Sequence, residues 1–523
     1  MPGRYLTLDE LTSCATALAV AHPDRAVLRR IGSSKAGEPI RLLSVGRGSR
    51  HVLVVAGPHA NEPVGGVTVL RLARYVARCM ARGGRAGRPG RSADNDRYVD
   101  TGTPASTRAN NHANNHADGR VNGHTDIRVN GQRANYPARD TVRETTGDTA
   151  GDSTRDVNRF ADTTWHFVLC LDPDGARRNE RWINGPMTFA HHYRHFFRPG
   201  FARQPEWLPT EPGARPMPET RALLDLQDEL RPYLQCSLHG VDVGGSFVQL
   251  TRGLPGLADR LARSAADNRI PVERGPYDAF FWPSPGPGVY DMPRAQEADQ
   301  FLSLPAATAA STWFHPRAYG TVTAVIEAPM WGVEEVGDTS PHPDPHGALE
   351  TISRTLRQDA RLLDGLLERV RPGLPGIAAS LLAPVEEYLA VCPGLADEWA
   401  PEGPLGEAGG LEAGYLPLNR ARIMALRIAA QRLVVRTAGL MDQMLDAGSG
   451  PSAAGRAAGA VNADAHDVRV TLDRFLTRRC EMFEAGCRAR WIPVHDQVEH
   501  QFRVVLAAAE LATRFGEPSS VQV

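Results

Sequence analysis

The chain has 523 residues, a hydrophobic fraction of 42% and a net charge of -1 from 59 basic and 60 acidic side chains. Its length exceeds one ordinary domain, and its balanced charge argues against a nucleic-acid binder or a basic membrane-binding surface. Its seven cysteines are odd in number and lack a C-x-x-C pair, which argues against a disulfide framework or a cysteine zinc site. Since the sequence has no apolar signal core and no bilayer-length apolar run, we expect a cytoplasmic protein.

The N-terminal segment predicts a helix followed by strands. Residues 6–21 carry a helical apolar stripe, with Thr7 as the cap and Glu10 at the capping-box position. The run at 51–57 is short, apolar and ends in glycine, which is typical of a buried central strand. Further apolar patterns predict strands at 26–31 and 40–46 and a helix at 63–80.

Residues 81–158 differ sharply in composition from the segments on either side. Gly, Arg, Asn, Asp, Thr and Ser dominate this stretch, and large apolar residues are almost missing from it. Such a segment cannot bury enough apolar surface to offset the entropy lost on ordering. We therefore expect a disordered insertion between two elements of the core.

Strands and helices alternate after the insertion. A buried strand at 165–171 runs into the turn signal Pro-Asp-Gly at 173–175. A helix is predicted at 219–230, between this strand and two later ones at 233–238 and 321–326. This alternation predicts an α/β fold with a largely parallel or mixed sheet in a first domain, residues 1–340.

The C-terminal third of the chain has a helical pattern. Apolar residues follow the 3.6-residue period from residue 349 to residue 370, and similar patterns occur further on. We expect a helical C-terminal domain over residues 345–523. The later helices are predicted near 420–446, 467–490 and 494–515, separated by a Pro/Gly-rich segment at 372–422 and an Ala/Gly-rich one at 447–465.

Chemistry-bearing residues follow three of the predicted strands. His59 and Glu62 come directly after the strand at 51–57 and before a helix, and His239 ends the strand at 233–238. Open α/β sheets place their sites in the loops at the carboxyl ends of strands. Two histidines and one glutamate form a three-ligand zinc set with an open fourth position. Glu327 ends an apolar strand, where a carboxylate needs a partner or a catalytic task.

These residues, in this order, resemble the motifs of the carboxypeptidase A-like zinc peptidases. The shared features are Gly-x-His-x-x-Glu after a strand, Pro-Asp-Gly, Arg-x-Asn, a strand-end His and a strand-end Glu, over roughly residues 1–340 without the insertion. The resemblance implies an α/β/α sandwich around a mixed eight-stranded sheet. It also implies one zinc ion per chain, held by His59, Glu62 and His239, with Glu327 as the general base.

The resemblance further implies residues that bind the substrate. The family places an arginine beside the zinc, and the Arg-x-Asn pattern assigns this role to Arg177, with Asn179 as a substrate-binding residue. An Asn-Arg pair clamps the substrate carboxylate in the family. Here Arg194 keeps the bidentate donor, but Tyr193 stands where the asparagine is expected.

Two features of the substrate pocket are less clearly marked. The pocket tyrosine of the family has two candidates here, Tyr290 and Tyr319. No acidic residue lies around 311–314, where the specificity pocket is expected, so a basic substrate side chain is disfavoured.

The first hypothesis is accordingly a zinc metallocarboxypeptidase that hydrolyses a peptide or amide bond near a substrate C-terminus. A second is an amidohydrolase or deacylase of the same clan, and a third is a zinc-binding pseudo-enzyme that acts through its helical domain. The expected partner is a peptide or small amide substrate, with neither nucleic acid nor membrane involved. The sequence leaves the oligomeric state and the natural substrate open.

Overall fold

The computed structural model describes residues 3–86, 162–211, 213–293, 301–304, 308–374, 376–407, 418–448 and 458–513. The predicted insertion at 81–158 lies outside the described residues from residue 87 onward. Helix α2 (Val64–Ala86) extends past residue 81, so the helix is longer than the pattern at 63–80 predicts.

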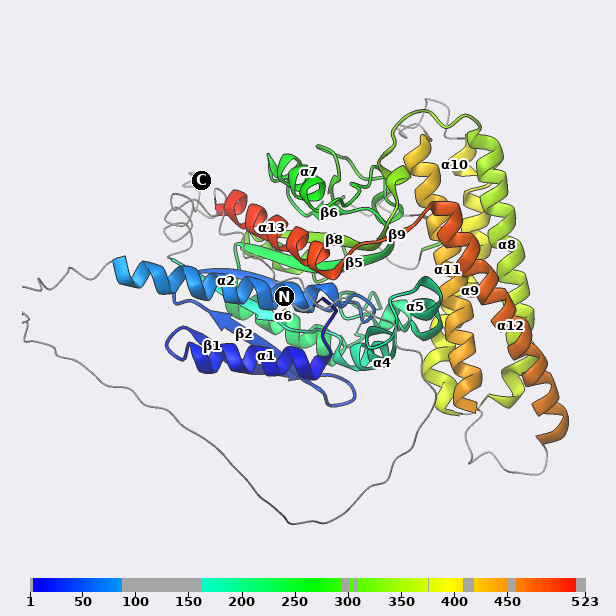
Figure 1. The fold of residues 1–523 in the computed structure, drawn as a ribbon, viewed down its shortest axis with the longest axis horizontal. Helices are drawn as coiled ribbons and strands as arrows, with labels where there is room; N and C mark the ends of the chain where they lie inside the picture. Colours follow the sequence, from blue (N-terminus) through cyan, green and yellow to red (C-terminus); the bar gives the residue numbers. More distant parts are fainter. Residues whose placement is uncertain are drawn as a thin grey trace, which may run out of the picture.

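A mixed β-sheet lies at the centre of the N-terminal part (Figure 1). Its strands follow the order β1-β2-β4-β3-β5-β8-β6-β7, and the short β9 pairs with β8. The central strands β4, β3, β5 and β8 are parallel, while β1, β2 and β6 join antiparallel. The predicted mixed eight-stranded sheet is confirmed. The strands are β1 Ala26–Ser33, β2 Pro39–Val45, β3 Arg50–Ala56, β4 Thr163–Val168, β5 Leu234–Gly244, β6 Phe247–Leu250, β7 Val289–Asp291, β8 Val322–Gly332 and β9 Arg490–Trp491.

Helices cover both faces of this sheet, as an α/β/α sandwich requires. Val52 and Val54 of β3 share one core with α1, α2, α7 and α13, whereas Leu53 and Val55 share another with α6. This division follows from the alternation of side chains along a strand. The helices of this part are α1 Leu8–Ala21, α2 Val64–Ala86, α4 Pro173–Ile183, α5 Phe189–His195, α6 Pro218–Leu230, α7 Leu257–Asp267 and α13 Val494–Ala512.

Local signals predicted some elements correctly and one incorrectly. The capping box of α1 is formed, with Glu10 N bonded to Thr7 Oγ1 and the Glu10 carboxylate bonded to Thr7 N. Pro173-Asp174-Gly175 was expected to form a turn, but it forms the first turn of α4. The side chain of Asp172 caps this helix by accepting a hydrogen bond from Gly175 N. Proline at the start of a helix loses no hydrogen bond, so the same letters suit both structures.

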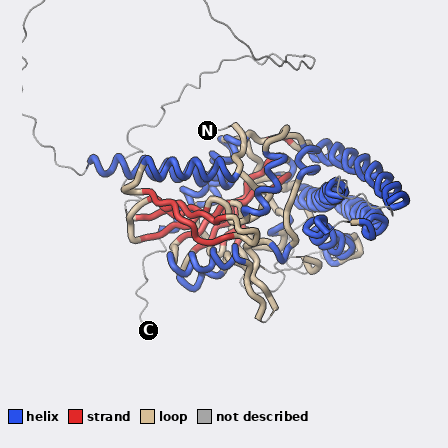
Figure 2. The backbone as a smooth tube through the Cα atoms, turned by 90° about the horizontal axis from the view of Figure 1, so that it is seen from below, coloured by secondary structure: helices blue, strands red, loops and turns tan. Residues whose placement is uncertain are grey.

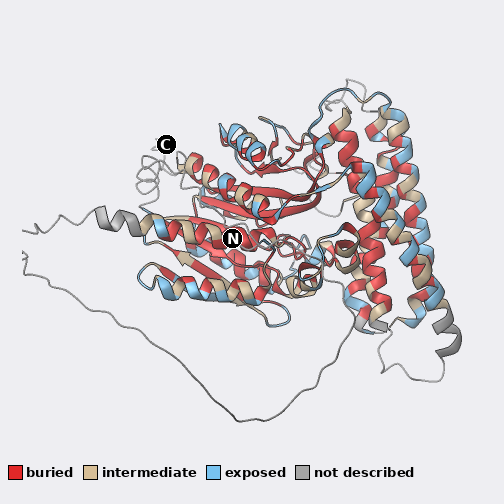
Figure 3. Cartoon of the chain, in the orientation of Figure 1, coloured by how far each residue is buried: buried red, intermediate tan, exposed pale blue. Residues whose placement is uncertain are grey.

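The predicted helical C-terminal region is present as a bundle beside the sheet (Figures 1 and 2). Its inner faces are buried and its outer faces exposed (Figure 3). Among the residues the structure describes, no helix combines the length and the apolar character of a membrane span. The bundle contains α8 Pro345–Val370, α9 Ala379–Glu398, α10 Pro404–Glu407, α11 Arg420–Gly448 and α12 Ala458–Cys487.

Helix α9 contradicts the prediction of a Pro/Gly-rich separator at 372–422. Two prolines, Pro384 and Pro393, lie inside this helix. Proline removes one backbone hydrogen bond and disfavours a helix. Here Leu381, Val385 and Leu389 recur at helical spacing and are buried against the bundle. Tertiary packing of this apolar stripe therefore outweighs the local signal.

The two parts of the chain share buried contacts. One core contains Trp182 and Phe189 from the N-terminal part together with Leu349 and Leu363 from α8. Helix α13, the last element, leaves the bundle and packs against the sheet beside α2. The division into domains at residues 340 and 345 stays a prediction.

Candidate functional site

His59 and Glu62 lie in the loop that joins β3 to α2. The loop begins at Gly57, whose φ of 58° is left-handed. A side chain at this position would meet Cys170 Sγ at 2.8 Å, so the turn requires glycine. The Glu62 amide donates to the His59 carbonyl over 3.1 Å, which holds the two residues in one turn.

His239 and Glu327 are neighbours in the sheet. The parallel strands β5 and β8 place them opposite each other, so both side chains leave the sheet on the same face. Strand β3 pairs with the other edge of β5, with Ala56 opposite Leu238. The loop after β3 therefore reaches the same place, and strand adjacency brings together the four residues that the sequence singles out.

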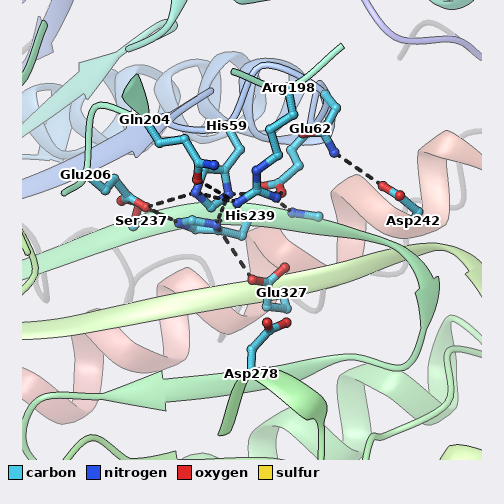
Figure 4. A network of polar contacts seen from close by, with 12 residues as sticks. His59, Glu62, Arg198, Gln204, Glu206, Ser237, His239, Asp242, Asp278 and Glu327 are labelled. Atoms are coloured by element: carbon cyan, nitrogen blue, oxygen red, sulfur yellow. Dashed lines mark hydrogen bonds and ion pairs between the residues drawn. The ribbon is translucent and has the colours of Figure 1, made fainter. Parts of the chain in front are cut away.

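Ligand atoms of three residues converge at the centre of the site (Figure 4). His59 Nδ1 lies 3.0 Å from Glu62 Oε1 and 3.1 Å from His239 Nδ1. His239 Nδ1 lies 3.2 Å from Glu62 Oε2. Tetrahedral zinc with bonds of about 2.1 Å holds its ligand atoms about 3.4 Å apart. The two imidazoles and the carboxylate therefore fit zinc after small side-chain adjustments.

A second buried carboxylate, Glu206, lies at the opposite edges of the two imidazole rings. Its Oε2 is 3.0 Å from His239 Nε2 and 3.8 Å from His59 Nε2. Its Oε1 accepts hydrogen bonds from Ser237 Oγ at 2.6 Å and from Trp313 Nε1 at 2.7 Å. Ligand atoms of His59, Glu206 and His239 all lie within 4.8 Å of one another, so this buried set also fits a metal ion.

No pattern in the sequence points to Glu206. It lies between α5 and α6 in the segment Gln-Pro-Glu-Trp, where no strand end or helical period marks it. Burial would raise the pKa of this carboxyl group, but the facing imidazoles of His239 and His59 lower it. A carboxylate on the far edge of a metal-binding histidine fixes the ring and its tautomer.

Burial and neighbouring charges shift the pKa values of the other groups. Burial and a nearby guanidinium lower the pKa of His59 to about 4. Burial also opposes the charged form of His239, but Glu206 and Glu62 outweigh it and raise this pKa well above its usual range. The imidazoles in turn hold the pKa of Glu62 well below its ordinary value, against the effect of burial. Because histidine binds metal without its proton at the ligating nitrogen, metal binding would release the proton held by His239.

Glu327 lies next to the converging ligand atoms. Its Oε1 is 3.7 Å from His239 Nδ1. Its Oε2 is buried and has no hydrogen-bond partner within the described part of the chain. Burial, together with the Glu62 and Asp278 carboxylates, raises the pKa of Glu327 well above its ordinary value. A carboxylate with raised proton affinity and a free oxygen is suited to accept a proton.

The structure does not bring Arg177 or Asn179 to this site. Arg177 pairs with Asp9 at 2.8 Å, Glu38 at 3.3 Å and Glu180 at 3.4 Å, and these three carboxylates hold its guanidinium against α1. Asn179 is buried, and its amide bonds the backbone of Gly175 and Phe197 and the indole of Trp182.

Tyr193 and Arg194 also lie away from the site. Arg194 reaches α12, where it donates to Asp473 at 2.6 Å and to Thr477 at 3.1 Å. Tyr193 is fully buried, and its ring contacts Phe189 and Phe483. Helix α5 therefore turns both side chains toward the bundle, and its residues join the two parts of the chain.

The arginine that reaches the cluster is Arg198, three residues after α5. Its Nη2 donates to His59 Nε2 at 2.9 Å and to Gln204 Oε1 at 3.0 Å, and its Nη1 donates to Glu62 Oε1 at 3.3 Å. The sequence has several arginines in this region, and no local pattern distinguishes Arg198 from Arg177 or Arg194. Only the path of the chain after α5 makes the distinction.

A cavity of about 200 Å³ opens at the cluster. Its walls include the aromatic residues Phe201, Trp207, Trp282 and Trp313. The acidic residue Asp278 also lines it and lies close to Glu327 (Figure 4). The expectation of a pocket without an acidic residue considered only residues 311–314, whereas Asp278 comes from the short 3-10 helix Tyr277–Ala279.

The two tyrosine candidates do not line this cavity. Tyr290 is buried and donates to the carbonyl of Glu273 at 3.0 Å, and Tyr319 lies at the surface and bonds Asp228. Tyr277 lines the cavity instead.

A comparison with known protein families agrees with the resemblance seen in the sequence. Residues 11–94 match a family model described as zinc carboxypeptidase, and this segment carries His59 and Glu62. Solved structures similar to this chain include a metallo-carboxypeptidase from Burkholderia cenocepacia, with 15% identity, a TM-score of 0.32 and coverage of 62% of this chain and 60% of that one. Carboxypeptidase A from Helicoverpa armigera has 12% identity, a TM-score of 0.34 and coverage of 64% and 70%. No curated protein sequence matches the chain.

Proposed function

We propose that this chain is a zinc-dependent hydrolase that cleaves a peptide or amide bond, with His59, Glu62 and His239 as the metal ligands. The convergence of the two Nδ1 atoms and the Glu62 carboxylate within 3.0 to 3.2 Å supports this assignment most directly. Glu206 then serves to orient the ring of His239, because its Oε2 lies 3.0 Å from His239 Nε2, whereas His59 Nε2 faces Arg198. A bound zinc ion would polarise the scissile carbonyl and acidify a water molecule.

The protein groups around the metal ligands have separate roles in the reaction. Glu327 accepts a proton from the attacking water and passes it to the leaving nitrogen. The guanidinium of Arg198 stabilises negative charge that develops on the carbonyl oxygen. The aromatic walls exclude water and contact an apolar group of the substrate.

Metal analysis of purified protein tests the ligand set. We expect about one zinc ion per chain. Each of the variants His59→Ala, His239→Ala and Glu62→Gln should lose the zinc ion, because only two protein ligands would remain. Glu206→Gln should keep zinc in excess metal but weaken its affinity by about 10-fold to 100-fold. Zinc that is lost in Glu206→Gln and kept in Glu62→Gln would reverse the roles of the two carboxylates.

Hydrolysis of a panel of peptides and N-acyl amino acids tests the catalytic role of Glu327. Glu327→Gln keeps the shape but cannot accept the proton, so turnover should fall by at least about a hundredfold. Zinc content should not change, since Glu327 is not a ligand in this proposal. Turnover near that of the wild type, with zinc bound, would remove Glu327 from the mechanism.

A further inference from the structure

The helical bundle forms one wall of the cavity. Tyr388 of α9 and Arg432, Leu433 and Arg436 of α11 line it together with the residues of the metal cluster. Arg436 is paired with Asp242, three residues after His239, and donates to its Oδ2 at 2.7 Å and 2.9 Å. This pair places α11 against the end of β5. The cavity is therefore built from both parts of the chain.

Arg432, which lies in this wall, is only weakly paired. Its side chain is only 12% exposed, and Asp278, at 3.8 Å, is the single carboxylate within ion-pair distance in the described part of the chain. A separation of 3.8 Å is longer than a hydrogen bond. A buried guanidinium carries five donors and is costly to leave poorly paired. Arg432 also lies one helical turn, about 5.4 Å, from Arg436, and both arginines line the cavity into which the metal cluster opens.

Two phenol groups that line the same cavity as Arg432 also lack partners. The hydroxyl groups of Tyr277 and Tyr388 are buried and make no hydrogen bond within the described residues, and both side chains line the same cavity. Buried hydroxyl groups normally find an acceptor, so each unmet donor calls for an explanation. One acceptor-rich group in this part of the cavity would satisfy both hydroxyls and the guanidinium.

We propose that Arg432, with Tyr277 and Tyr388, binds a carboxylate group of the ligand, and that the helical bundle thereby selects acidic substrates. Carboxylate oxygens match the geometry of guanidinium and phenol donors. The aromatic walls suit an apolar group next to that carboxylate. Calling the ligand a substrate rests on the proposed hydrolase function, whereas the subsite itself rests on the unmet donors.

The acidic residues of the cavity leave room for such a ligand. Glu387 is already engaged by the backbone amide of Phe201. The side chain of Asp278 is 44% exposed, so it can turn to water when another carboxylate takes its place beside Arg432. The exchange replaces a long ion pair by direct hydrogen bonds.

Binding of two isosteric probes, 3-phenylpropanoate and 3-phenylpropanamide, tests the subsite in the full-length protein. Trp207, Trp282 and Trp313 line the cavity, so tryptophan fluorescence reports binding, and calorimetry gives the dissociation constants. We expect the wild type to bind the carboxylate at least about tenfold more tightly than the amide. Arg432→Gln should reduce this ratio to within about twofold, and Tyr388→Phe should reduce it by about threefold.

Arg420→Gln is the matched control, because Arg420 lies on the same helix with an equal 3.8 Å ion pair to Asp338 and does not line the cavity. The ratio should persist in this variant and in protein stripped of metal. Equal affinities of the wild type for the two probes would overturn the proposal. So would an affinity ratio that persists in Arg432→Gln, or one that is lost only in Arg198→Gln or only when the metal is removed. Because no bond is cleaved, a failure of the hydrolase assignment would show separately, as binding without turnover.

Discussion

The pKa values of buried carboxylates in this protein depend on the groups that face them. Imidazoles face Glu62 and Glu206 and keep their pKa values low. Glu273 lacks such a partner. Its Oε2 accepts one hydrogen bond from the Gly245 amide at 2.8 Å, and burial raises its pKa to about 8. Glu273 therefore holds a proton in the folded state at a pH where the unfolded chain has lost it.

This difference predicts a pH-dependent stability that one substitution removes. Between about pH 5 and pH 8 Glu273 keeps its proton in the folded state and loses it in the unfolded state, so its contribution to the free energy of unfolding falls as pH rises. Glu273→Gln mimics the protonated form at every pH. Its stability should be close to that of the wild type at pH 5 and higher by about 3 kcal/mol at pH 8. Denaturant titrations at both pH values measure the difference.

The exposed Glu350 supplies the control for this prediction, because its side chain is 63% exposed. Glu350→Gln should differ from the wild type by the same small amount at pH 5 and pH 8. A constant difference for Glu273→Gln as well would show that Glu273 is ionised in the folded protein.

For individual residues, the sequence predicted which side chains lie together where the ends of strands determine their positions. The sequence could predict that His59, Glu62, His239 and Glu327 lie together. Each follows or ends an apolar run, and parallel strands bring their carboxyl ends to one edge. Glu206 lies in an irregular segment whose path depends on packing. It could not be found, because no period relates its sequence position to its place in the fold.

Among the secondary-structure elements, α13 contacts the site directly although it lies far from the site residues in the sequence. Gln501 Nε2 donates to the His239 carbonyl at 2.6 Å and to the Ile326 carbonyl at 3.1 Å. Its Oε1 accepts a hydrogen bond from Thr68 Oγ1 of α2 at 3.0 Å. One side chain thus ties β5, β8 and α2 together beside His239 and Glu327.

We predict that Gln501→Met weakens zinc binding. The substitution leaves two buried carbonyls without their donor, costs about 1 to 3 kcal/mol of stability and loosens the backbone of His239. Zinc affinity, measured by competition with a chelator, should fall by about tenfold or more, as for other groups that support a ligand.

Gln497→Met provides a matched comparison one turn earlier on α13. Gln497 is equally buried, donates to the Ile492 carbonyl at 2.7 Å and accepts from Tyr5 at 2.8 Å, away from the metal cluster. This variant should lose a similar amount of stability and keep its zinc affinity. Equal affinities in the two variants would limit Gln501 to a structural role.

Helix α9 shows why the sequence missed an element that other helices resemble. Apolar periodicity predicted α1, α8, α11 and α12, whose stripes are long and regular. In α9 two prolines concealed a similar stripe. The sequence also could not distinguish between Arg177, Arg194 and Arg198, because all three carry the same guanidinium group. Only the packing of α4 and α5 decides which of them reaches His59.

For the whole molecule, the decisive question is whether the sheet and the bundle are stable separately. The pair between Asp242 of β5 and Arg436 of α11 is buried on both sides, with 0% and 8% of the side chains exposed. Asp242 also accepts a hydrogen bond from Asn61, next to Glu62 in the metal-binding loop. The bundle is therefore tied to that loop through one ion pair.

We predict that the two parts unfold in one transition because of this pair. Arg436→Met leaves the Asp242 carboxylate buried without its cation and should lower the free energy of unfolding by about 3 to 5 kcal/mol. Asp242→Asn should lower it by a similar amount. The double variant should lose much less than the sum, since no charge is left unpaired. Denaturant unfolding followed by fluorescence and by circular dichroism measures all four proteins.

The surface pair of Arg420 and Asp338 is the comparison, because both side chains are more than a third exposed. Breaking this pair should cost no more than about 1 kcal/mol, since water screens it. Two results together would show that the sheet and the bundle are independent domains. The decreases in the free energy of unfolding caused by the Asp242 and Arg436 substitutions would be additive, and the wild type would show separate transitions for the two parts. A single coincident transition and strong coupling would instead mean that the cavity wall bearing Arg432 forms only with the whole fold, because α11 then has no stable position apart from β5.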